Sequence, residues 1–323
     1  MKRIGNLFEK ICSIENLKLA DEKARKGKSK QYGIKLHDKN RENNILLLHE
    51  SLKNKTYKTS EYNVFEIHEP KIRKIYSLPY YPDRIVHHGI MNILESIFLS
   101  VFTTDSYSCI KGKGIHGALL NLNEDLKDRN DTEYCLKLDI KKFYPSINNT
   151  ILKSLLRKKF KDKDLLWLLD EIIDSAEGCP IGNYLSQTFA NFYLAYFDHW
   201  LKENKKIKYY FRYCDDMVIL SDNKKELHEL LLEINNYLNV NLKLELKSNY
   251  QIFSVEARGI DFVGYKSFHD FILLRKSIKN KFIKMLRFNK NNKSISSYYG
   301  WFKYCDSYKL MNKYIPNYPS ESL

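Results

Sequence analysis

Three aspartates have the residue type and the placement needed to bind divalent metal ions. Asp139 ends the β-rich run EYCLKLD, whereas Asp215 and Asp216 lie between the β-rich runs KIKYYFRY and MVILS. The two flanking runs predict a β-hairpin that carries both carboxylates at its tip. Aspartate is also common in turns that have no chemical function. Three carboxylates from neighbouring strands could nevertheless hold two Mg²⁺ ions, roughly 3.5 to 4 Å apart, for phosphoryl transfer to a 3′-hydroxyl.

The bulk composition favours a nucleic acid as the partner. The chain has 323 residues, and its 54 lysines and arginines outnumber its 39 aspartates and glutamates, so the formal net charge is +15. A surface with such an excess attracts polyanions, although the base composition of a genome can produce the same excess of lysine. The length is sufficient for a large catalytic domain with a substantial core.

The cysteines and the apolar runs indicate a reducing compartment and no membrane partner. The six cysteines contain no C-x-x-C pair and no zinc-ligand spacing; they are Cys12, Cys109, Cys135, Cys179, Cys214 and Cys305. The first residues lack the continuous apolar segment of a secretory signal, and no later run approaches the length of a membrane span. We therefore expect a cytoplasmic protein.

Hydrophobic periodicity and turn residues predict the elements of the first half of the chain. Helices are expected over residues 4–25 and 36–54, and strands over EYNVFEIHE and RKIYSLP on either side of Pro70. Asp83 is expected to cap a helix that runs to Phe102. The glycine- and lysine-rich run YSCIKGKG fits a loop near phosphates or, equally, a solvated connector.

The second half of the chain predicts helices around the acidic hairpin. Pro180 and Gly182 predict a turn that is followed by a long helix, and two further helices are expected between residues 274 and 314. His87 and His88 have no ligand partners nearby in the sequence, which favours helix packing over metal binding. Aromatic residues at helical spacing favour the core over a stacking surface; these are Phe189, Phe192, Tyr193, Tyr196, Phe197 and Trp200.

The order of these motifs resembles the reverse transcriptase family. An aspartate strand, the glycine–serine turn with its helix in CPIGNYLSQTFANF, and a Y-x-D-D hairpin occur in the family's order. The run PKIRKIYSLPYYPDRIVHH resembles the fingers motif that grips a triphosphate, and GIDFVGY resembles the loop that supports the primer end. The resemblance implies an α+β right-hand polymerase fold, with fingers, a palm of antiparallel sheet and helices, and a short helical thumb.

The resemblance also implies a division of the chain. A helical N-terminal extension and the start of the fingers would occupy residues 1–60, and the fingers with the first palm helix residues 61–132. The palm with the catalytic motifs would occupy residues 133–268, and the thumb residues 269–323. Lysines of the thumb would neutralise the phosphates of a bound duplex, which makes binding fall with salt.

In this family the three aspartates bind two Mg²⁺ ions, for which Mn²⁺ can substitute, so Asp139, Asp215 and Asp216 are the expected catalytic residues and metal ligands. Tyr144 stands where the family has an aromatic gate against the ribose 2′ position, with a core tyrosine as the alternative. Lys247 falls near the family's proton donor to pyrophosphate, in a loosely matching stretch. The expected nucleotide-binding residues are Lys71, Arg73, Tyr144, Ile181, Gly182 and Gln187.

The run IGNYLSQ resembles a narrower group. Most reverse transcriptases carry Q-G-x-x-x-S-P there, whereas those of diversity-generating retroelements carry the form found here, with Ile181 first and Gln187 last. The resemblance implies error-prone RNA-directed DNA synthesis, mutagenic at template adenines, in a bacterium or phage. The implied partners are template RNA, the RNA/cDNA duplex, deoxynucleoside triphosphates and a small basic helical accessory protein. A phage-defence or retron enzyme is the alternative, although the V-T-G of retron thumbs is missing, and a catalytically idle RNA-binding scaffold is a further one.

Overall fold

The computed structural model describes residues 3–68, 72–288 and 292–314. The chain divides into two compact units, and each is described by itself. Unit 1 comprises Met1–Thr103, Lys141–Phe197 and Leu238–Leu244, and unit 2 comprises Thr104–Ile140, Asp198–Tyr237 and Glu245–Leu323. No helix in the described part of the chain combines the length and the apolar character that a membrane crossing requires.

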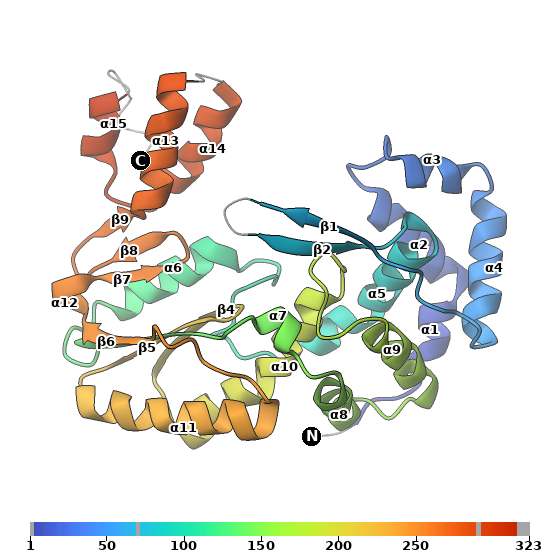
Figure 1. Cartoon of the computed structure of the whole chain (residues 1–323), viewed down its shortest axis with the longest axis horizontal. Helices are drawn as coiled ribbons and strands as arrows, with labels where there is room; N and C mark the ends of the chain where they lie inside the picture. The colour runs from blue at the N-terminus through green and yellow to red at the C-terminus, as the bar shows by residue number, and fades with distance from the viewer. Residues whose placement is uncertain (1–2, 69–71, 289–291, 315–323) are drawn as a thin grey trace. The chain divides into compact units, whose positions relative to one another are not determined.

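Unit 1 is mainly helical (Figure 1). Its helices are α1 (Phe8–Cys12), α2 (Ile14–Arg25), α3 (Tyr32–Asp38), α4 (Arg41–Lys53), α5 (Ile85–Leu99), α7 (Phe143–Ser146), α8 (Asn149–Lys159), α9 (Lys163–Asp174) and α10 (Ser186–His199), whose last residues belong to unit 2.

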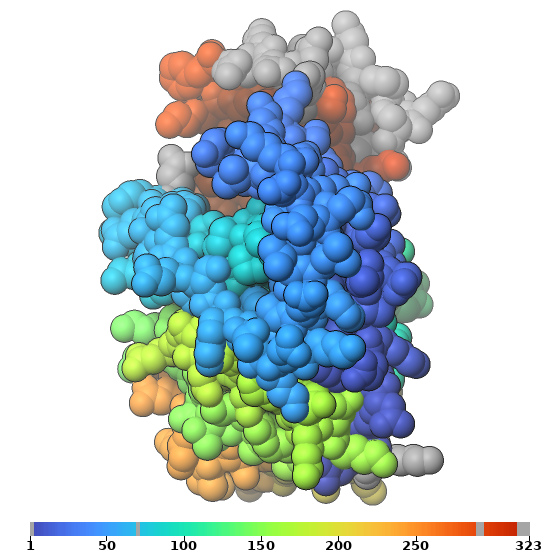
Figure 2. Space-filling view, turned by 90° about the vertical axis from the view of Figure 1, so that its right-hand side faces the viewer, coloured from blue at the N-terminus to red at the C-terminus, as the bar shows by residue number. Residues whose placement is uncertain are grey.

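The two N-terminal helices predicted from periodicity are each broken in two. Residues 4–25 form α1 and α2 because the side chain of Ser13 accepts a hydrogen bond from the backbone N–H of Asn16, which caps a new helix. Residues 36–54 are interrupted after Asp38, and α4 begins at Arg41. Helix α4 lies on the face of unit 1 that Figure 2 presents.

A two-stranded antiparallel hairpin, β1 (Asn63–Ile67) and β2 (Arg73–Ser77), confirms the two predicted strands, with Asn63 opposite Ser77. Pro70 and Lys71 lie outside the described residues. The backbone N–H of Tyr76 on β2 donates a 2.7 Å hydrogen bond to the carbonyl oxygen of Ile181, which ties the hairpin to the turn after Pro180.

The predicted capping role of Asp83 is wrong. Asp83 is fully buried in the kinked turn Tyr80–Arg84, in which the backbone of Tyr81 is not helical, and helix α5 that follows ends at Leu99, earlier than expected. Its carboxylate accepts hydrogen bonds from the hydroxyl of Tyr57, at 2.8 Å, and from the backbone N–H of Ser60, at 3.1 Å. The carboxylate therefore fixes the segment before the hairpin instead of a helix end.

Unit 2 is built on a four-stranded antiparallel sheet in the order β4-β5-β3-β6 (Figure 1). A second, three-stranded sheet has the order β7-β8-β9. The strands are β3 (Tyr134–Asp139), β4 (Tyr209–Tyr213), β5 (Asp216–Ser221), β6 (Gln251–Ser254), β7 (Ile260–Phe262), β8 (Tyr265–Ser267) and β9 (Ile272–Leu274).

The helices of unit 2 include three C-terminal ones where the sequence predicted two. The chain turns between α14 and α15 because Asp306 pairs with Ile272 of β9: each backbone N–H of the pair donates to the other residue, and both distances are 2.8 Å. The described helices are α6 (Gly114–Asp125), α11 (Lys224–Leu242), whose last residues belong to unit 1, α12 (Val255–Arg258), α13 (Lys276–Phe288), α14 (Asn292–Phe302) and α15 (Tyr308–Tyr314).

Strand β3 places its side chains alternately on the two faces of the four-stranded sheet. Cys135, Lys137 and Asp139 share one face, and Cys135 joins a buried apolar cluster with Ala118 and Leu122 of α6. Lys137 and Asp139 extend this face past the apolar cluster to the end of the strand. A packed core thus holds the polar end of β3 in place.

Candidate active site

Strand pairing brings the three predicted aspartates together within unit 2. Asp139 is the last residue of β3 and Asp216 is the first of β5, and the two are direct partners across the antiparallel pair. Asp215 precedes Asp216 in the turn between β4 and β5, so the predicted acidic hairpin is confirmed. The register therefore sets the separation of these carboxylates.

A buried arginine supports the turn that carries Asp215. Tyr213 pairs with Asp216, which leaves a two-residue turn whose first residue, Cys214, has φ of +55°, a region that favours glycine. Arg212 donates a 3.1 Å hydrogen bond to the carbonyl oxygen of Cys214. The same guanidinium binds both carboxylate oxygens of Asp198 on α10, and both side chains are fully buried. A bidentate pair of this kind holds its geometry tightly.

The positive charge around Asp139, Asp215 and Asp216 is too small to offset the burial of their carboxylates. Burial, followed by the negative charge of Asp139, raises the pKa of Asp215 to about 7. Burial also raises the pKa of Asp216, with Lys137 acting in the opposite direction. One oxygen of Asp139, Oδ1, is buried and has no hydrogen-bond partner. The ionised forms of these groups would be stabilised by additional cations.

Two lysines neutralise part of this charge. Lys137 forms an ion pair with Asp216, and Lys247 Nζ lies 2.6 Å from Asp139 Oδ2. The backbone N–H of Lys247 also donates to the carbonyl oxygen of Asp139 at 2.8 Å, which brings this residue beside the carboxylates. Lys137 was not among the residues predicted from the sequence. Its position two residues before Asp139 on a strand, and therefore on the same face, is a signal that could have identified it.

The site fits a divalent metal ion by the chemistry of its donors. Among the described residues, no group of three or more His, Cys, Asp or Glu side chains converges as a ready-made metal site. The unpartnered Oδ1 of Asp139 and the raised pKa values of Asp215 and Asp216 nevertheless mark hard oxygen donors that require positive charge. A bound ion would compete with Lys137 and Lys247 for these oxygens.

A basic cavity adjoins the carboxylates within unit 2. Asp139 and Asp216 line a cavity of about 1050 Å³, together with residues of the three-stranded sheet and of α13 and α15. Basic side chains outnumber acidic ones on its wall. The basic ones are Lys137, Arg258, Lys266, Arg275, Lys276, Lys279 and Lys309. Such a wall attracts the phosphates of a polyanion.

Several of the predicted nucleotide-binding residues lie together in unit 1. The backbone N–H of Cys179 donates to the carbonyl oxygen of Tyr144 at 2.9 Å, so the turn before α10 lies against Tyr144. Gly182 has φ of +111°, and an added Cβ would come within 2.7 Å of the carbonyl oxygen of Tyr76. Only glycine allows this approach between the turn and β2. The side chain of Ile181 on the same turn is partly exposed.

The remaining predicted residues are placed as follows. Arg73 is exposed at the start of β2, and Gln187 is exposed in the first turn of α10. Lys71 lies outside the described residues. His87 is buried in α5 and His88 stacks on Tyr184 with ring centroids 4.1 Å apart, so the prediction of helix packing is confirmed.

The aromatic residues of α10, together with Trp200 directly after this helix, confirm the prediction of core packing. Four of the six predicted residues are buried, and Tyr196 and Trp200 are partly exposed. Phe98 of α5 packs against Phe192 with ring centroids 5.3 Å apart. The helix therefore contributes to the core of unit 1 instead of presenting a stacking surface.

A sequence model described as "Reverse transcriptase (RNA-dependent DNA polymerase)" matches residues 57–267, well over half of the chain. The chain belongs to the reverse transcriptase family. The aspartate strand, the glycine turn and the acidic hairpin all lie within the matched residues. Residues before 57 and after 267 lie outside the match.

Curated relatives include bacterial proteins of different kinds. Protein YkfC of Escherichia coli (strain K12) is 23% identical over 241 residues, which cover 61% of this chain and 63% of that protein. The Retron Ec73 reverse transcriptase of Escherichia coli is 30% identical over 195 residues, or 54% of this chain and 60% of the relative. The Group II intron-encoded protein LtrA of Lactococcus lactis subsp. cremoris is 25% identical over 51% of this chain and 29% of that protein. The chain thus spans less than two thirds of the length of these relatives.

Solved structures of telomerase share the fold. The telomerase from Candida tropicalis, in complex with a fragment of telomeric RNA, matches with a TM-score of 0.53 and 12% identity, over 79% of this chain and 55% of that one. The Candida albicans enzyme, also in complex with a fragment of telomeric RNA, matches with a TM-score of 0.52 and 12% identity, over 74% of this chain and 52% of that one. These matches confirm the predicted α+β polymerase fold, and at this identity they concern the fold alone.

Proposed function

We propose that this chain is an RNA-directed DNA polymerase, which extends a DNA strand along an RNA template with deoxynucleoside triphosphates. The observation that carries the proposal is the set of three carboxylates at the end of β3 and in the β4–β5 turn, two of which have raised pKa values. Membership of the reverse transcriptase family supports the same reaction. The proposed setting is the cytoplasm of a bacterium.

In this proposal Asp139, Asp215 and Asp216 hold two Mg²⁺ ions. Divalent ions in such a site lower the pKa of an attacking hydroxyl and stabilise the charge on leaving phosphate oxygens. Lys247, whose Nζ is 2.6 Å from Asp139 Oδ2, would donate a proton to the leaving pyrophosphate. Arg212 and Asp198 keep the turn in position during the reaction.

The nucleotide-binding roles are proposed for residues of unit 1. Tyr144 would exclude the ribose 2′-hydroxyl, and Arg73, with Lys71, would grip the triphosphate through charged hydrogen bonds. Gly182 allows the turn to approach β2 closely. Ile181 and Gln187 would shape the pocket for the new base pair.

Primer extension on an RNA template tests the polymerase proposal. Asp215→Asn should abolish deoxynucleotide incorporation, because it removes a metal ligand, while filter binding of RNA stays within about twofold of wild type. Undiminished synthesis by this variant would remove the metal-site assignment. Binding of RNA by a wild-type chain that synthesises nothing would favour the scaffold alternative.

We further propose that the enzyme belongs to a diversity-generating retroelement and that a small basic helical protein assists it. The motif IGNYLSQ, with Ile181 in place of the common glutamine, supports this role. An apolar side chain cannot hydrogen-bond the nascent base pair, and a lost contact of about 1 kcal/mol reduces discrimination several-fold. Errors should concentrate opposite template adenines.

Sequencing of cDNA made from the enzyme's own RNA tests this narrower role. Ile181→Gln should lower the error rate opposite adenine several-fold, and Leu232→Gln, an exposed position on α11 (71% exposed), serves as the control. Uniformly low error opposite all four bases would favour a retron or phage-defence enzyme. The 30% identity to a retron reverse transcriptase is the observation that favours this alternative.

A further inference from the structure

Four of the six cysteines of the chain differ chemically from Cys109. Burial raises the pKa of four thiols to about 12, those of Cys12, Cys135, Cys179 and Cys305. Cys109 differs, because its residue is exposed and a hydrogen bond with Cys214 lowers the pKa of its thiol to about 6. This shift gives the thiol of Cys109 more thiolate character than the four buried thiols have, and the thiolate is the reactive form of cysteine.

One hydroxyl joins Cys109 to Cys214, although the two lie far apart in the sequence. Ser108 Oγ is 3.3 Å from Cys109 Sγ and 2.8 Å from Cys214 Sγ. Ser108 itself is buried. Both sulfur atoms thus lie within one hydrogen-bond length of the same oxygen.

Backbone hydrogen bonds to β4 hold the segment before Cys109 beside the β4–β5 turn. The N–H of Tyr107 donates to the carbonyl oxygen of Arg212 at 3.0 Å, and the N–H of Arg212 donates to the carbonyl oxygen of Asp105 at 2.9 Å. The segment before Cys109 therefore runs beside the end of β4, which places Cys109 next to the β4–β5 turn. Cys109 and Cys214 both have positive φ, of 56° and 55°, which is uncommon for residues other than glycine.

We propose that Cys109 and Cys214 form a redox-responsive dithiol, a modification site at which a peroxide converts the two thiols into a disulfide. The thiolate of Cys109 attacks one peroxide oxygen, the O–O bond breaks, and Cys109 becomes a sulfenic acid while hydroxide leaves. The sulfur of Cys214 then displaces the sulfenic oxygen as water. The two cysteines lose two protons and two electrons in total, which is two hydrogen atoms, and hydrogen peroxide is reduced to two molecules of water.

The disulfide would act on the turn that carries Asp215. A disulfide requires the sulfur atoms to lie about 2.05 Å apart, closer than two thiols in hydrogen-bond contact. Cys214 directly precedes Asp215, so closing the bond pulls the turn toward Cys109 and displaces that carboxylate. The predicted effect on synthesis rests on the proposed function, whereas formation of the disulfide does not.

Thiol mapping of the full chain tests the site without any activity measurement. After treatment with hydrogen peroxide and alkylation of the remaining thiols, digestion should yield one peptide pair that links Cys109 to Cys214, with two hydrogen atoms lost, and dithiothreitol should release it. Cys109→Ser should abolish the pair, whereas Cys305→Ser should retain it. Absence of the pair, or a link between two copies of the chain through Cys109, overturns the proposal.

Primer extension by the same samples tests the consequence. Peroxide should reduce synthesis by wild type and by Cys305→Ser at least tenfold, with recovery in dithiothreitol, and should leave Cys109→Ser within about twofold of its untreated rate. Equal sensitivity of Cys109→Ser overturns the regulatory role. If the untreated chain synthesises nothing, the proposed function fails, and the mapping still decides on the dithiol.

Discussion

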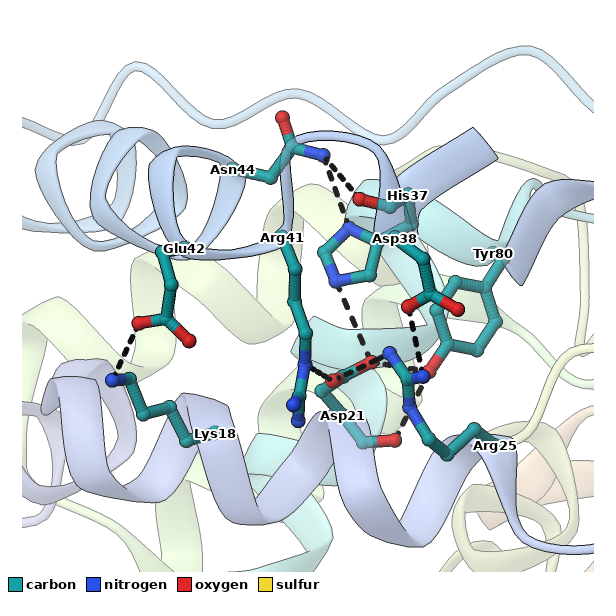
Figure 3. A network of polar contacts seen from close by, with 9 residues as sticks. All are labelled: Lys18, Asp21, Arg25, His37, Asp38, Arg41, Glu42, Asn44 and Tyr80. Carbon is teal, nitrogen blue, oxygen red and sulfur yellow. Dashed lines mark hydrogen bonds and ion pairs between the residues drawn. The ribbon is translucent and has the colours of Figure 1, made fainter. Parts of the chain in front are cut away.

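Two carboxylate sites, one in each unit, have opposite charge balances. Asp21 in unit 1 is fully buried, and its carboxylate accepts hydrogen bonds from Arg25, Arg41 and Tyr80, with His37 Nε2 3.5 Å away (Figure 3). Burial alone would raise the pKa of Asp21, but the hydrogen bonds from Tyr80, Arg25 and Arg41 outweigh it and hold the pKa below its ordinary value.

The carboxylates of unit 2 have the opposite balance. Asp215 has a pKa raised to about 7, and Asp139 Oδ1 has no partner. The neighbours of Asp21 supply enough positive charge to keep its carboxylate ionised. Asp21 has a structural role, since its contacts connect α2, α3, α4 and the turn before α5. A set of carboxylates with too little positive charge is suited to binding a cation that arrives from outside.

The largest effect is expected from Asp139→Asn. Synthesis should fall on the order of 10³-fold, because the proposed metal contact of Asp139 would supply several kcal/mol of transition-state stabilisation. The urea midpoint should stay the same or rise, because the substitution removes a negative charge that opposes ionisation of Asp215. Single-turnover primer extension and urea unfolding measure the two quantities. A large loss of stability would place Asp139 in the same structural class as Asp21.

Asp21→Asn should show the reverse behaviour. The free energy of unfolding at pH 7 should fall by about 3 kcal/mol, because arginines that were paired with a buried charge lose their partner. Glu42→Gln is the matched control, since its ion pair with Lys18 (Figure 3) is exposed and exposed pairs contribute little to stability. Urea unfolding followed by circular dichroism distinguishes them. Equal effects of the two substitutions would contradict the contrast drawn between the sites.

The stability difference between wild type and Asp21→Asn should depend on pH. The pKa of Asp21 is lower in the folded chain than its ordinary value, so ionisation of Asp21 stabilises the fold above the unfolded value of about 3.9. This contribution is lost as the pH falls through the lower folded value. The difference in urea midpoint should therefore be constant from pH 7 to about pH 5 and shrink below about pH 4. A difference that grew on acidification would have the wrong sign for a lowered pKa.

The smallest effect is expected from Lys137→Met. The ammonium group of Lys137 pairs with Asp216 and would compete with a metal ion for its carboxylate. If this partly exposed pair contributes about 1 kcal/mol, its removal should make metal binding roughly fivefold tighter. Calorimetric titration of the free protein with Mn²⁺ measures the change. Lys127→Met, which removes an exposed pair with Glu124, is the control and should not alter the affinity. Weaker Mn²⁺ binding by Lys137→Met would show that the lysine supports the site instead of competing with it.

Local patterns in the sequence predicted much of the acidic hairpin. The strands around Asp215 and Asp216, the β1–β2 pair and helix α10 follow from alternation, turn residues and helical spacing, which act over a few residues. The three aspartates were expected on neighbouring strands, and the position of Asp139 opposite Asp216 agrees with that expectation.

Partners that lie far apart in the sequence could not be predicted in this way. Aspartate is a residue type that often caps helices, but Asp83 is buried and accepts hydrogen bonds from Tyr57 and Ser60 instead. The contacts of Cys214 with Ser108 likewise depend on the pairing of whole segments. The break at Ser13 had a local signal, a serine that can cap, which the longer apolar pattern obscured.

The link from Arg212 to Asp198 has a consequence for the order of folding. The two residues are 14 positions apart, so closing the loop between them costs little chain entropy. Contacts that are close in sequence also form quickly. The end of α10 and the β4–β5 turn can therefore assemble as one early unit, with the carbonyl oxygen of Cys214 already held by Arg212. We expect Asp139 to join later, when β3 pairs with β5 across a longer stretch of sequence, and to add the third carboxylate beside the turn.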